Sequence, residues 1–277
     1  MLAYLGPAGT YCSEAAEKYL RGQKQKIKPE PLNSISQIIN SVSAGKYTYG
    51  IVPIENTIEG SVRTTLDKLV RKKLYIIAEV DIAIKHQLLT LHSVQSKKEI
   101  REITSHEQAI EQCRDFIERE YPSAKIITAK STAGAVKNVL QKQLRCRAVI
   151  GSRAAAGRYG LQILQQNIAD YKDNVTRFVV LAREIQYPAR DAITSFVFSC
   201  KKDRPGGLYE MLGFLARDKI NMTKIESRPG KGVIGDYVFF VDIDGNYALQ
   251  AKVKAALDSI QKHSDFFKLL GVYQRRK

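Results

Sequence analysis

The chain has 277 residues, of which 44% are hydrophobic and 26% charged, a balance typical of a globular protein with a real core and long enough for two domains. No apolar run approaches the roughly 20 residues that a membrane-spanning helix needs, and the first residues lack the basic and apolar segments of a secretion signal, so we expect a cytoplasmic protein without a membrane anchor. The four cysteines form no CxxC pair and have no histidine at zinc-like spacing, which predicts reduced structural thiols and no metal site.

The formal net charge of +16 raises the question of nucleic-acid binding. The basic excess is spread over both halves of the chain, and its tightest runs are only Arg71-Lys72-Lys73 and Arg275-Arg276-Lys277. There is no Trp, and the 14 Tyr are scattered, so the sequence does not predict an aromatic stacking surface. We therefore expect no nucleic-acid partner, whereas a positive field would attract a small anionic substrate.

Short apolar runs alternate with amphipathic stretches as far as residue 181, which predicts an α/β arrangement with mainly parallel sheets. Ser105, with Gln108 three residues later, has the pattern of a capping box at the start of a helix. The expected strands are 2–5, 49–53, 75–84, 126–129, 148–151 and 177–181. The expected helices are 13–21, 34–44, 61–70, 105–119, 131–142 and 152–163.

The pattern changes after a break at residues 187–191. The expected elements are then a strand at 194–201, a helix at 206–218, strands at 221–228 and 236–244, a helix at 248–262 and a strand at 267–273. This βαββαβ order predicts a ferredoxin-like second domain.

Two strand ends in the first half carry residues suited to ligand binding. Glycines in the run from Gly6 to Thr10 would let backbone N–H groups approach an anion at a helix N-terminus, although for this run by itself a plain turn capped near Thr10 is the favoured interpretation. The run is neither a Walker A loop nor a G-x-G-x-x-G motif. Glu55 and Asn56 follow an apolar strand, at the edge where open α/β sheets bind ligands, or they form an Asx-type turn that caps the next helix.

Three further polar stretches fit either a ligand-binding role or an ordinary structural one. Gln108 and Gln112 lie four apart, on one face of an expected helix, where they would bind carboxylates or hydroxyls or simply be solvated. The hydroxyls of Ser131 and Thr132 open a helix, a position typical of N-caps, and would alternatively face a cleft shared with Thr10. The residues 173–178 read as an ordinary strand entry, and composition alone does not single out Thr176.

Taken together and in this order, the motifs resemble the prephenate dehydratase family over nearly the whole chain. They are GPAGTY (6–11), GIVPIENTIEGSV (50–62), SHEQAIEQC (105–113), STAGA (131–135), AVIGSRAAAGRYGL (148–161), NVTRF (174–178), RPGGLYEML (204–212) and NMTKIESRP (221–229). Each motif alone would be weak evidence for the family, but eight motifs in the right order and with the right spacing are specific for it.

The resemblance implies a catalytic domain at 1–185 that resembles a periplasmic-binding protein, followed by a ferredoxin-like ACT regulatory domain at 192–275. Lobe one would comprise about 1–77 and 165–185, and lobe two about 78–164. The resemblance also implies that the polar candidates share one groove, namely Thr10, Glu55, Asn56, Ser105, Gln112, Ser131, Thr132 and Thr176. Arg177 is a further candidate for a substrate carboxylate, although strand alternation points it away from Thr176.

The implied reaction converts prephenate to phenylpyruvate, water and carbon dioxide without a cofactor or metal, with Thr176 as the catalytic residue that assists the leaving hydroxyl. Arogenate dehydratase, the same reaction on the aminated substrate, is the alternative, and an amino-acid-sensing binding protein is a second. Cys12 departs from the family, which usually has Ser or Thr there.

The implied regulation is feedback inhibition by L-phenylalanine in a homodimer or homotetramer. The residues expected to bind phenylalanine are Gly207, Leu208, Asn221, Met222, Glu226, Ser227 and Arg228. Gly207 departs from the family, where many members have Ala, and loosens the expected loop. A ferredoxin-like domain with a tight Pro-Gly-Gly turn and no ligand is the alternative.

Overall fold

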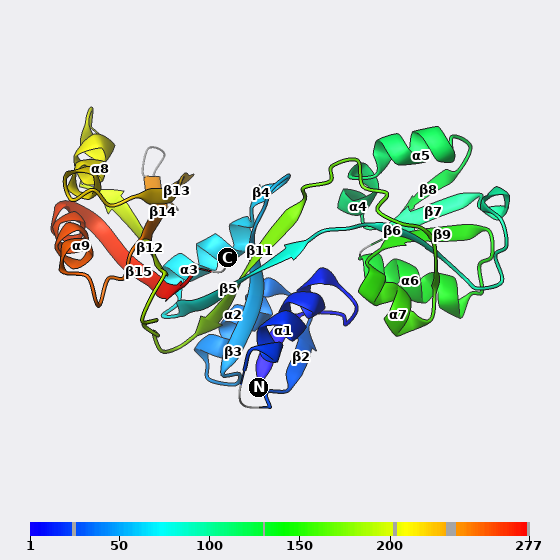
Figure 1. The fold of residues 1–277 in the computed structure, drawn as a ribbon, viewed down its shortest axis with the longest axis horizontal. Helices are drawn as coiled ribbons and strands as arrows, with labels where there is room; N and C mark the ends of the chain where they lie inside the picture. The colour runs from blue at the N-terminus through cyan, green and yellow to red at the C-terminus, as the bar shows by residue number, and fades with distance from the viewer. Residues whose placement is uncertain (24–25, 130, 202–203, 231–236, 276–277) are drawn as a thin grey trace. The chain divides into compact units, whose positions relative to one another are not determined.

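A computed structural model describes residues 1–277 apart from 24–25, 130, 202–203, 231–236 and 276–277 (Figure 1). The chain forms two compact units. Unit 1 comprises 1–35, 53–62 and 81–178, and unit 2 comprises 36–52, 63–80 and 179–277. The lobe and domain boundaries expected from the sequence stay predictions.

Unit 1 holds the first strands and a separate five-stranded sheet. The first part consists of β1 (Leu2–Leu5), α1 (Tyr11–Arg21), β2 (Pro29–Leu32) and β4 (Gly60–Ser61), together with the ends of β3 (Tyr49–Asn56), β5 (Tyr75–Ala83) and β11 (Val175–Ala182). The strand order there is β5-β11-β3-β1-β2, and β4 pairs with β3. Strands β1 and β2 are parallel.

The five-stranded sheet has the order β10-β6-β9-β7-β8. Its strands are β6 (Gln87–Thr90), β7 (Glu102–Ser105), β8 (Lys125–Thr128), β9 (Arg147–Gly151) and β10 (Gln162–Gln165). Helices α4 (Glu107–Glu111) and α5 (Arg114–Glu120) cover one face, α6 (Thr132–Gln141) and α7 (Arg153–Tyr159) cover the other, and the short 3-10 helix η1 spans Lys97–Glu99 (Figure 1). Strands β7, β8 and β9 are parallel, but β6 runs antiparallel to β9 and β10, so the expectation of mainly parallel sheets is wrong for this edge.

Unit 2 contains α2 (Ile35–Ser43), α3 (Arg63–Arg71) and the C-terminal elements. These are β12 (Ala192–Cys200), α8 (Gly207–Arg217), β13 (Met222–Pro229), β14 (Tyr237–Asp244), α9 (Ala251–His263) and β15 (Ser264–Gln274). The observed order confirms the predicted βαββαβ pattern. The strand order β13-β14-β12-β15 is that of a ferredoxin-like sheet, and a core that includes Phe196, Leu215 and Leu257 lies between its strands and helices.

The expected helix at 105–119 is wrong as a single helix. Ser105 is the last residue of β7, and its hydroxyl donates to the carbonyl of Ile150 (2.8 Å) instead of capping a helix. His106 is the N-cap of α4, where its ring accepts from the backbone N–H of Gln108 (3.4 Å). The expected helix at 152–163 also ends early, because Gly160 takes a left-handed conformation.

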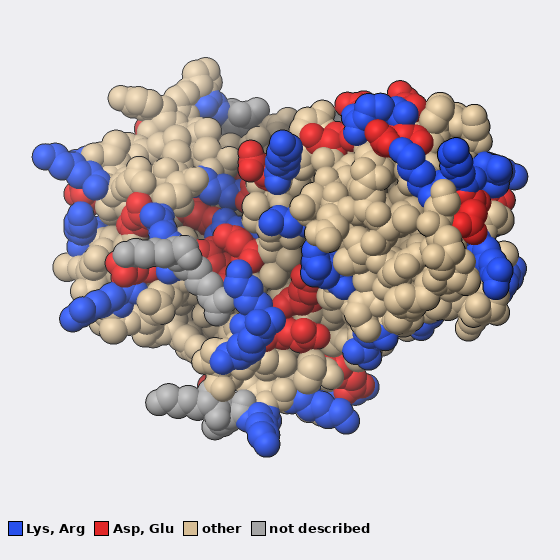
Figure 2. Space-filling model, turned by 45° about the vertical axis from the view of Figure 1, so that its right-hand side comes forward, with Lys and Arg blue, Asp and Glu red and all other residues tan. Residues whose placement is uncertain are grey.

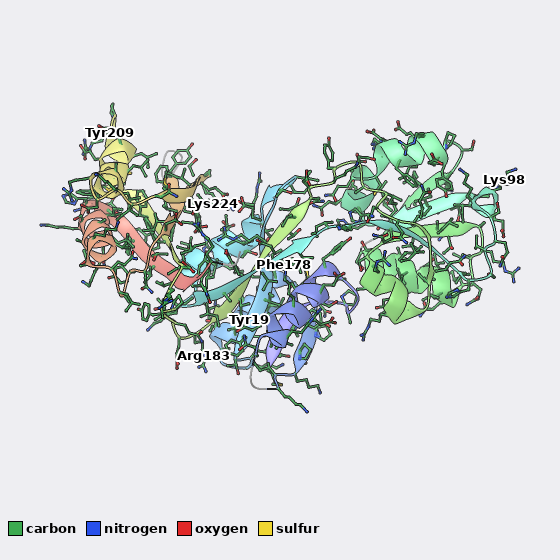
Figure 3. The ribbon with its side chains drawn as sticks, viewed as in Figure 1. Tyr19, Lys98, Phe178, Arg183, Tyr209 and Lys224 are labelled. Atoms are coloured by element: carbon green, nitrogen blue, oxygen red, sulfur yellow. The ribbon has the colours of Figure 1, made fainter. Side chains whose placement is uncertain are left out.

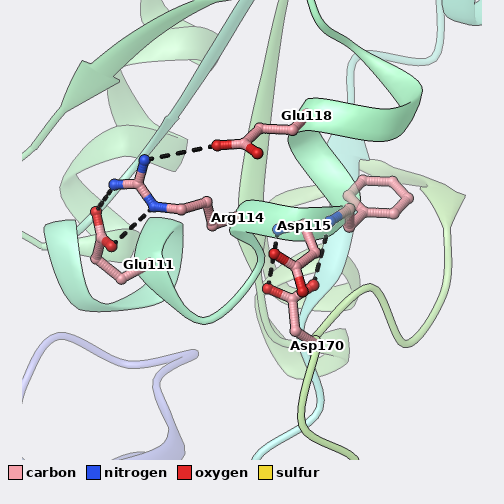
Figure 4. A network of polar contacts seen from close by, with 6 residues as sticks. Glu111, Arg114, Asp115, Glu118 and Asp170 are labelled. Atoms are coloured by element: carbon pink, nitrogen blue, oxygen red, sulfur yellow. Dashed lines mark hydrogen bonds and ion pairs between the residues drawn. The ribbon is translucent and has the colours of Figure 1, made fainter.

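The start of α5 is capped from far along the chain (Figure 4). The N-cap residue Cys113 makes no side-chain cap bond, and the carboxylate of Asp170 accepts from the N–H groups of Asp115 and Phe116, both at 3.1 Å. Arg114 pairs with Glu111 and with Glu118 on the neighbouring surface.

Because Asp170 satisfies two otherwise unpaired helix donors, Asp170→Ala is expected to lower the free energy of unfolding by about 1–2 kcal/mol. Urea denaturation checks this value. Asp173→Ala removes an exposed carboxylate from the same loop and is the control, expected to change stability by no more than about 0.5 kcal/mol. Equal losses in the two variants would contradict the capping role.

Among the residues that the structure describes, no helix is long and apolar enough to cross a membrane. On the face shown in Figure 2, Lys and Arg side chains are interspersed with Asp and Glu and do not gather into one basic patch. This distribution agrees with the spread of charge along the sequence.

Candidate active site

A cavity of about 490 Å³ lies within unit 1. Its walls come from the ends of β1, β3 and β11 and from the starts of several helices. Six of the residues expected from the sequence line it: Thr10, Asn56, Gln112, Ser131, Thr132 and Thr176. The volume is sufficient for a small organic acid.

Thr176 is held at the cavity by Asn56. The side-chain oxygen of Asn56 accepts from the backbone N–H groups of Ile58 and Glu59, both at 3.0 Å, in an Asx-type turn. Its Nδ2 therefore faces the other way and donates to Thr176 Oγ1 (2.9 Å) and to Asn174 Oδ1 (2.7 Å). Since Thr176 Oγ1 accepts from Asn56, its own hydrogen remains for a group in the cavity.

A second chain of bonds leads from Asn174 to an imidazole. Asn174 Nδ2 donates to Gln112 Oε1 (2.9 Å), which also lies 3.0 Å from His86 Nε2. His86 Nδ1 lies 3.5 Å from the hydroxyl of Tyr11, and the two rings meet edge to face. Burial lowers the pKa of His86, against the effect of its bond to Gln112, and burial raises the pKa of Tyr11 above its usual value. Both groups are therefore uncharged at neutral pH.

Helix N-termini supply the positive end of the cavity. Thr10 is the N-cap of α1 and Ser131 the N-cap of α6, and both belong to the lining. Among the described lining residues there is no Lys or Arg. An anion bound here would therefore meet backbone N–H groups, hydroxyls and helix dipoles. Cys12 also lines the cavity, and burial raises the pKa of its thiol to about 12, so it stays protonated.

Three expected site residues do not line the cavity. Glu55 and Arg177 adjoin Asn56 and Thr176 on their strands, and side chains alternate between the faces of a strand, so these two pair with each other (3.9 Å). Ser105 is fully buried, and its hydroxyl lies 3.3 Å from Thr132 Oγ1. The expected groove is therefore corrected for Glu55, which points elsewhere, and for Ser105, which adjoins a lining residue. Arg177, which was expected apart from the groove as a further candidate, does not line the cavity either.

The sequence reading missed four residues of this region: Tyr11, Glu59, His86 and Asn174. Glu59 accepts from Gln112 Nε2 at 3.4 Å. His86 follows the strand expected at 75–84, and a search for polar residues at every strand end would have found it, as it found Glu55 and Asn56. Asn174 is buried, and only the fold shows that it links two other amides.

The residues expected to bind phenylalanine lie in unit 2, most of them with partners. Gly207 opens α8, Leu208 and Met222 pack against the core of this unit, and Asn221 donates to Asp244 (2.8 Å). In contrast, Tyr209 projects outward from α8 and is 81% exposed (Figure 3). Phe178, labelled in the same figure, lies on β11 of unit 1 and lines the cavity there.

The motif from Glu226 to Arg228 lies on β13. Glu226 lies 3.6 Å from Lys224, and Ser227 pairs in register with Phe239 of β14. Arg228 reaches α3 of the same unit, where it pairs with Asp67 (3.2 Å) and donates to the carbonyl of Arg63 (3.4 Å). The roles expected for these residues stay predictions. No group of three or more His, Cys, Asp or Glu that could hold a metal ion occurs in the described part of the chain.

The family model, a relative and a solved structure name the same family. The family model described as prephenate dehydratase matches residues 2–186. A prephenate dehydratase from Methanocaldococcus jannaschii is 38% identical over 273 residues, which are 98% of this chain and 96% of that protein. The crystal structure of prephenate dehydratase from Arthrobacter aurescens in complex with L-Phe is similar, with a TM-score of 0.88 and 31% identity over 99% of this chain and 90% of that one.

A further solved structure has nearly the same fold and a different named activity. It is described as GqqA, a novel type of quorum quenching acylase, and it has a TM-score of 0.87 and 27% identity, covering 99% of this chain and 98% of that one. Fold similarity alone therefore does not fix the reaction, and the residues of the cavity carry the functional argument.

Proposed function

The chain belongs to the prephenate dehydratase family, and from this and the geometry of the cavity we propose that it converts prephenate to phenylpyruvate, water and carbon dioxide. The observation that carries the proposal is the bond from Asn56 to Thr176 Oγ1, which leaves the Thr176 hydrogen as a donor at the cavity. No cofactor or metal is part of the proposed reaction.

Prephenate carries a hydroxyl and a ring carboxylate on opposite sides of a cyclohexadiene. The C–O bond breaks and its electron pair leaves with the oxygen, while the bond to the carboxylate breaks and its electrons complete the benzene ring. Aromatisation supplies much of the driving force, so the protein has chiefly to help the oxygen leave as hydroxide, which takes up a proton from solvent to become water. A hydrogen bond from Thr176 to that oxygen stabilises the negative charge that develops on it.

Most of the remaining lining residues suit a dianionic substrate, and the one carboxylate named in the described lining, Glu59, accepts from Gln112 Nε2 (3.4 Å). The N-termini of α1 and α6 offer N–H groups to a carboxylate, and Ser131 and Thr132 add hydroxyls. The Thr10 hydroxyl donates to the carbonyl of Pro7 (2.9 Å), so Thr10 acts here as the cap that shapes the N-terminus of α1. Gln112 and Asn56 orient neutral amides at the wall and bring no charge that would compete with the substrate. Because Glu55, Ser105 and Arg177 are outside the lining, we do not give them a direct contact with substrate.

The test is phenylpyruvate formation from prephenate by the purified protein without added cofactor or metal. Turnover supports the proposal. Absence of turnover with prephenate and activity with arogenate would move the assignment to the aminated substrate. Failure with both, in a protein that still binds an aromatic amino acid, would leave a sensing role.

We further propose that residues 1–185 form a two-lobed catalytic domain like a periplasmic-binding protein and that 192–275 form an ACT domain that binds L-phenylalanine. The βαββαβ order and the positions of Gly207 and the motif from Glu226 to Arg228 support the second assignment. Strand β13 ends its sheet order and exposes Ile225, which supports a homodimer through this edge. Light scattering with and without phenylalanine tests whether a dimer or a tetramer forms.

Gly207→Ala is expected to strengthen phenylalanine inhibition several-fold. A Cβ at Gly207 would meet Arg204 and Cys200 at 3.8 Å, an ordinary contact, so alanine fits and restricts the loop without strain. The measurement is the phenylalanine concentration that halves the rate. Gly206→Ala is the contrasting variant, because Gly206 has a φ of 82° that alanine adopts only with strain, and it is expected to weaken inhibition. Unchanged inhibition in both variants would contradict a ligand-binding loop.

A further inference from the structure

The polar side chains behind the cavity wall form a continuous series in which the direction of each bond is fixed by the one before. The series begins at two backbone donors, the N–H groups of Ile58 and Glu59, which can only donate. They assign the oxygen of Asn56, and therefore its Nδ2 faces Asn174 and Thr176. No choice of amide orientation remains at this point.

The bond directions are fixed as far as the imidazole of His86. Asn174 receives a bond at Oδ1 and therefore presents Nδ2 to Gln112, whose Oε1 accepts it (2.9 Å). That oxygen can only accept, so the atom 3.0 Å away, His86 Nε2, carries a hydrogen. In a neutral ring Nδ1 then has none and accepts from Tyr11.

Asn174 is the centre of this series. Its side chain is 1% exposed, it does not line the cavity, and it bonds to both Asn56 and Gln112. Its backbone is also fixed, because its carbonyl accepts from the N–H of Ile84 (2.8 Å). A buried amide with both ends paired to two lining residues holds their orientation and touches no ligand itself.

We propose that Asn174 and His86 are positioning residues that keep the Thr176 hydroxyl and the Gln112 amide facing the cavity as hydrogen-bond donors. The N–H groups of Ile58 and Glu59 set the direction of the Asn56 amide, and Asn174 holds its Nδ2 as an acceptor. Asn174 in turn sets the direction of the Gln112 amide, and His86 keeps Gln112 Oε1 occupied, so that the Gln112 Nε2 side stays toward Glu59 and the cavity. The kinetic part of the proposal rests on the proposed dehydratase reaction, and the tautomer of His86 does not.

The first experiment compares two variants of similar shape change. Asn174→Leu removes both bonds without adding charge and is expected to lower kcat about 10- to 100-fold with KM within about three-fold, because the donors lose their alignment. Asn138→Leu is the matched control: Asn138 is half-buried on α6, accepts from Arg147 (3.2 Å), lies outside the series, and is expected to keep kcat within about two-fold.

The second experiment separates the hydrogen bond of His86 from its bulk. His86→Gln places an N–H donor near the position of Nε2, and His86→Met fills similar space without a donor. His86→Gln is expected to retain most of kcat, and His86→Met to lose about ten-fold. Thermal unfolding of every variant verifies that it is folded before rates are compared.

A spectroscopic measurement tests the series without turnover. Nitrogen NMR of the four histidines, with the His86 signal assigned by its loss in His86→Gln, is expected to show the Nε2–H tautomer in the parent protein and a mixture of tautomers in folded Asn174→Leu. An Nδ1–H tautomer in the parent protein overturns the proposal. So does a folded Asn174→Leu with kcat within two-fold of the parent, or equal rates for His86→Gln and His86→Met. If prephenate is not turned over at all, the proposed function fails while the tautomer still decides the bond directions.

Discussion

Replacing Thr176 by valine is expected to lower kcat for phenylpyruvate formation by about 10²- to 10⁴-fold, with KM changed much less. Valine matches the shape of threonine but has no hydroxyl, so the loss isolates the donor. Thr176 Oγ1 already accepts from Asn56, and its hydrogen is therefore the one that the leaving oxygen would meet. Steady-state assays with prephenate measure the effect.

Thr176→Ser is the control for this prediction. Serine keeps the hydroxyl and loses only a methyl group, so it is expected to retain activity within about ten-fold of the parent protein. Valine and serine variants with similar rates would contradict the role of Thr176. A valine variant with unchanged kcat and raised KM would make Thr176 a binding residue that acts equally before and during the reaction.

Gly271→Ala is expected to cause a large loss of stability in unit 2. A Cβ on Gly271 of β15 would lie 2.1 Å from the carbonyl oxygen of Ile76, its register partner on the parallel strand β5. The atoms nearest to this Cβ are all backbone atoms of Ile76, so no flexible side chain can move aside and the two strands have to separate locally. We expect the free energy of unfolding to fall by about 3 kcal/mol and Tm by about 6–12 °C.

Gly213→Ala makes the same chemical change where there is room. Gly213 lies within α8, and a Cβ there would meet nothing within 4 Å, so the better helix propensity of alanine is expected to raise stability by up to about 1 kcal/mol. Thermal unfolding followed by circular dichroism is expected to show a lower Tm for Gly271→Ala and a higher Tm for Gly213→Ala if the close approach at Gly271 is the cause. A Gly271→Ala protein as stable as the parent would contradict it.

The sequence predicted those parts of the molecule that depend on local patterns. Apolar runs placed most long strands within a few residues, and β1 was predicted with its observed bounds. The change in the pattern of strand-like and helix-like stretches after residue 187 predicted the βαββαβ order, which the structure has. Some short strands were missed, among them β2 and β7, because their sequences PEPL and EITS contain no apolar run like that of β1.

The family resemblance also depended on residue types and their spacing. Through it the sequence predicted six site residues that the fold brings to one cavity, namely Thr10, Asn56, Gln112, Ser131, Thr132 and Thr176. Most of them are recognisable because they stand at the end of a strand or the start of a helix, where sequence position and ligand access coincide, whereas Gln112 is the C-cap of α4 and Thr176 stands near the start of β11. Strand alternation already pointed Arg177 away from Thr176, but the sequence could not exclude Glu55, since adjacent residues on a strand differ only in which face they take.

The tertiary structure alone decided which polar groups meet and in which direction each bond points. Asn56 and Thr176 are 120 residues apart and Asn174 and Gln112 are 62 apart, so no local pattern records their bonds. Hydrogen bonds act over about 3 Å and depend on orientation, whereas sequence spacing fixes only faces and ends of elements. For this reason the sequence determined which residue types stand near the cavity, and only the fold determined that the Thr176 hydroxyl is presented there as a donor.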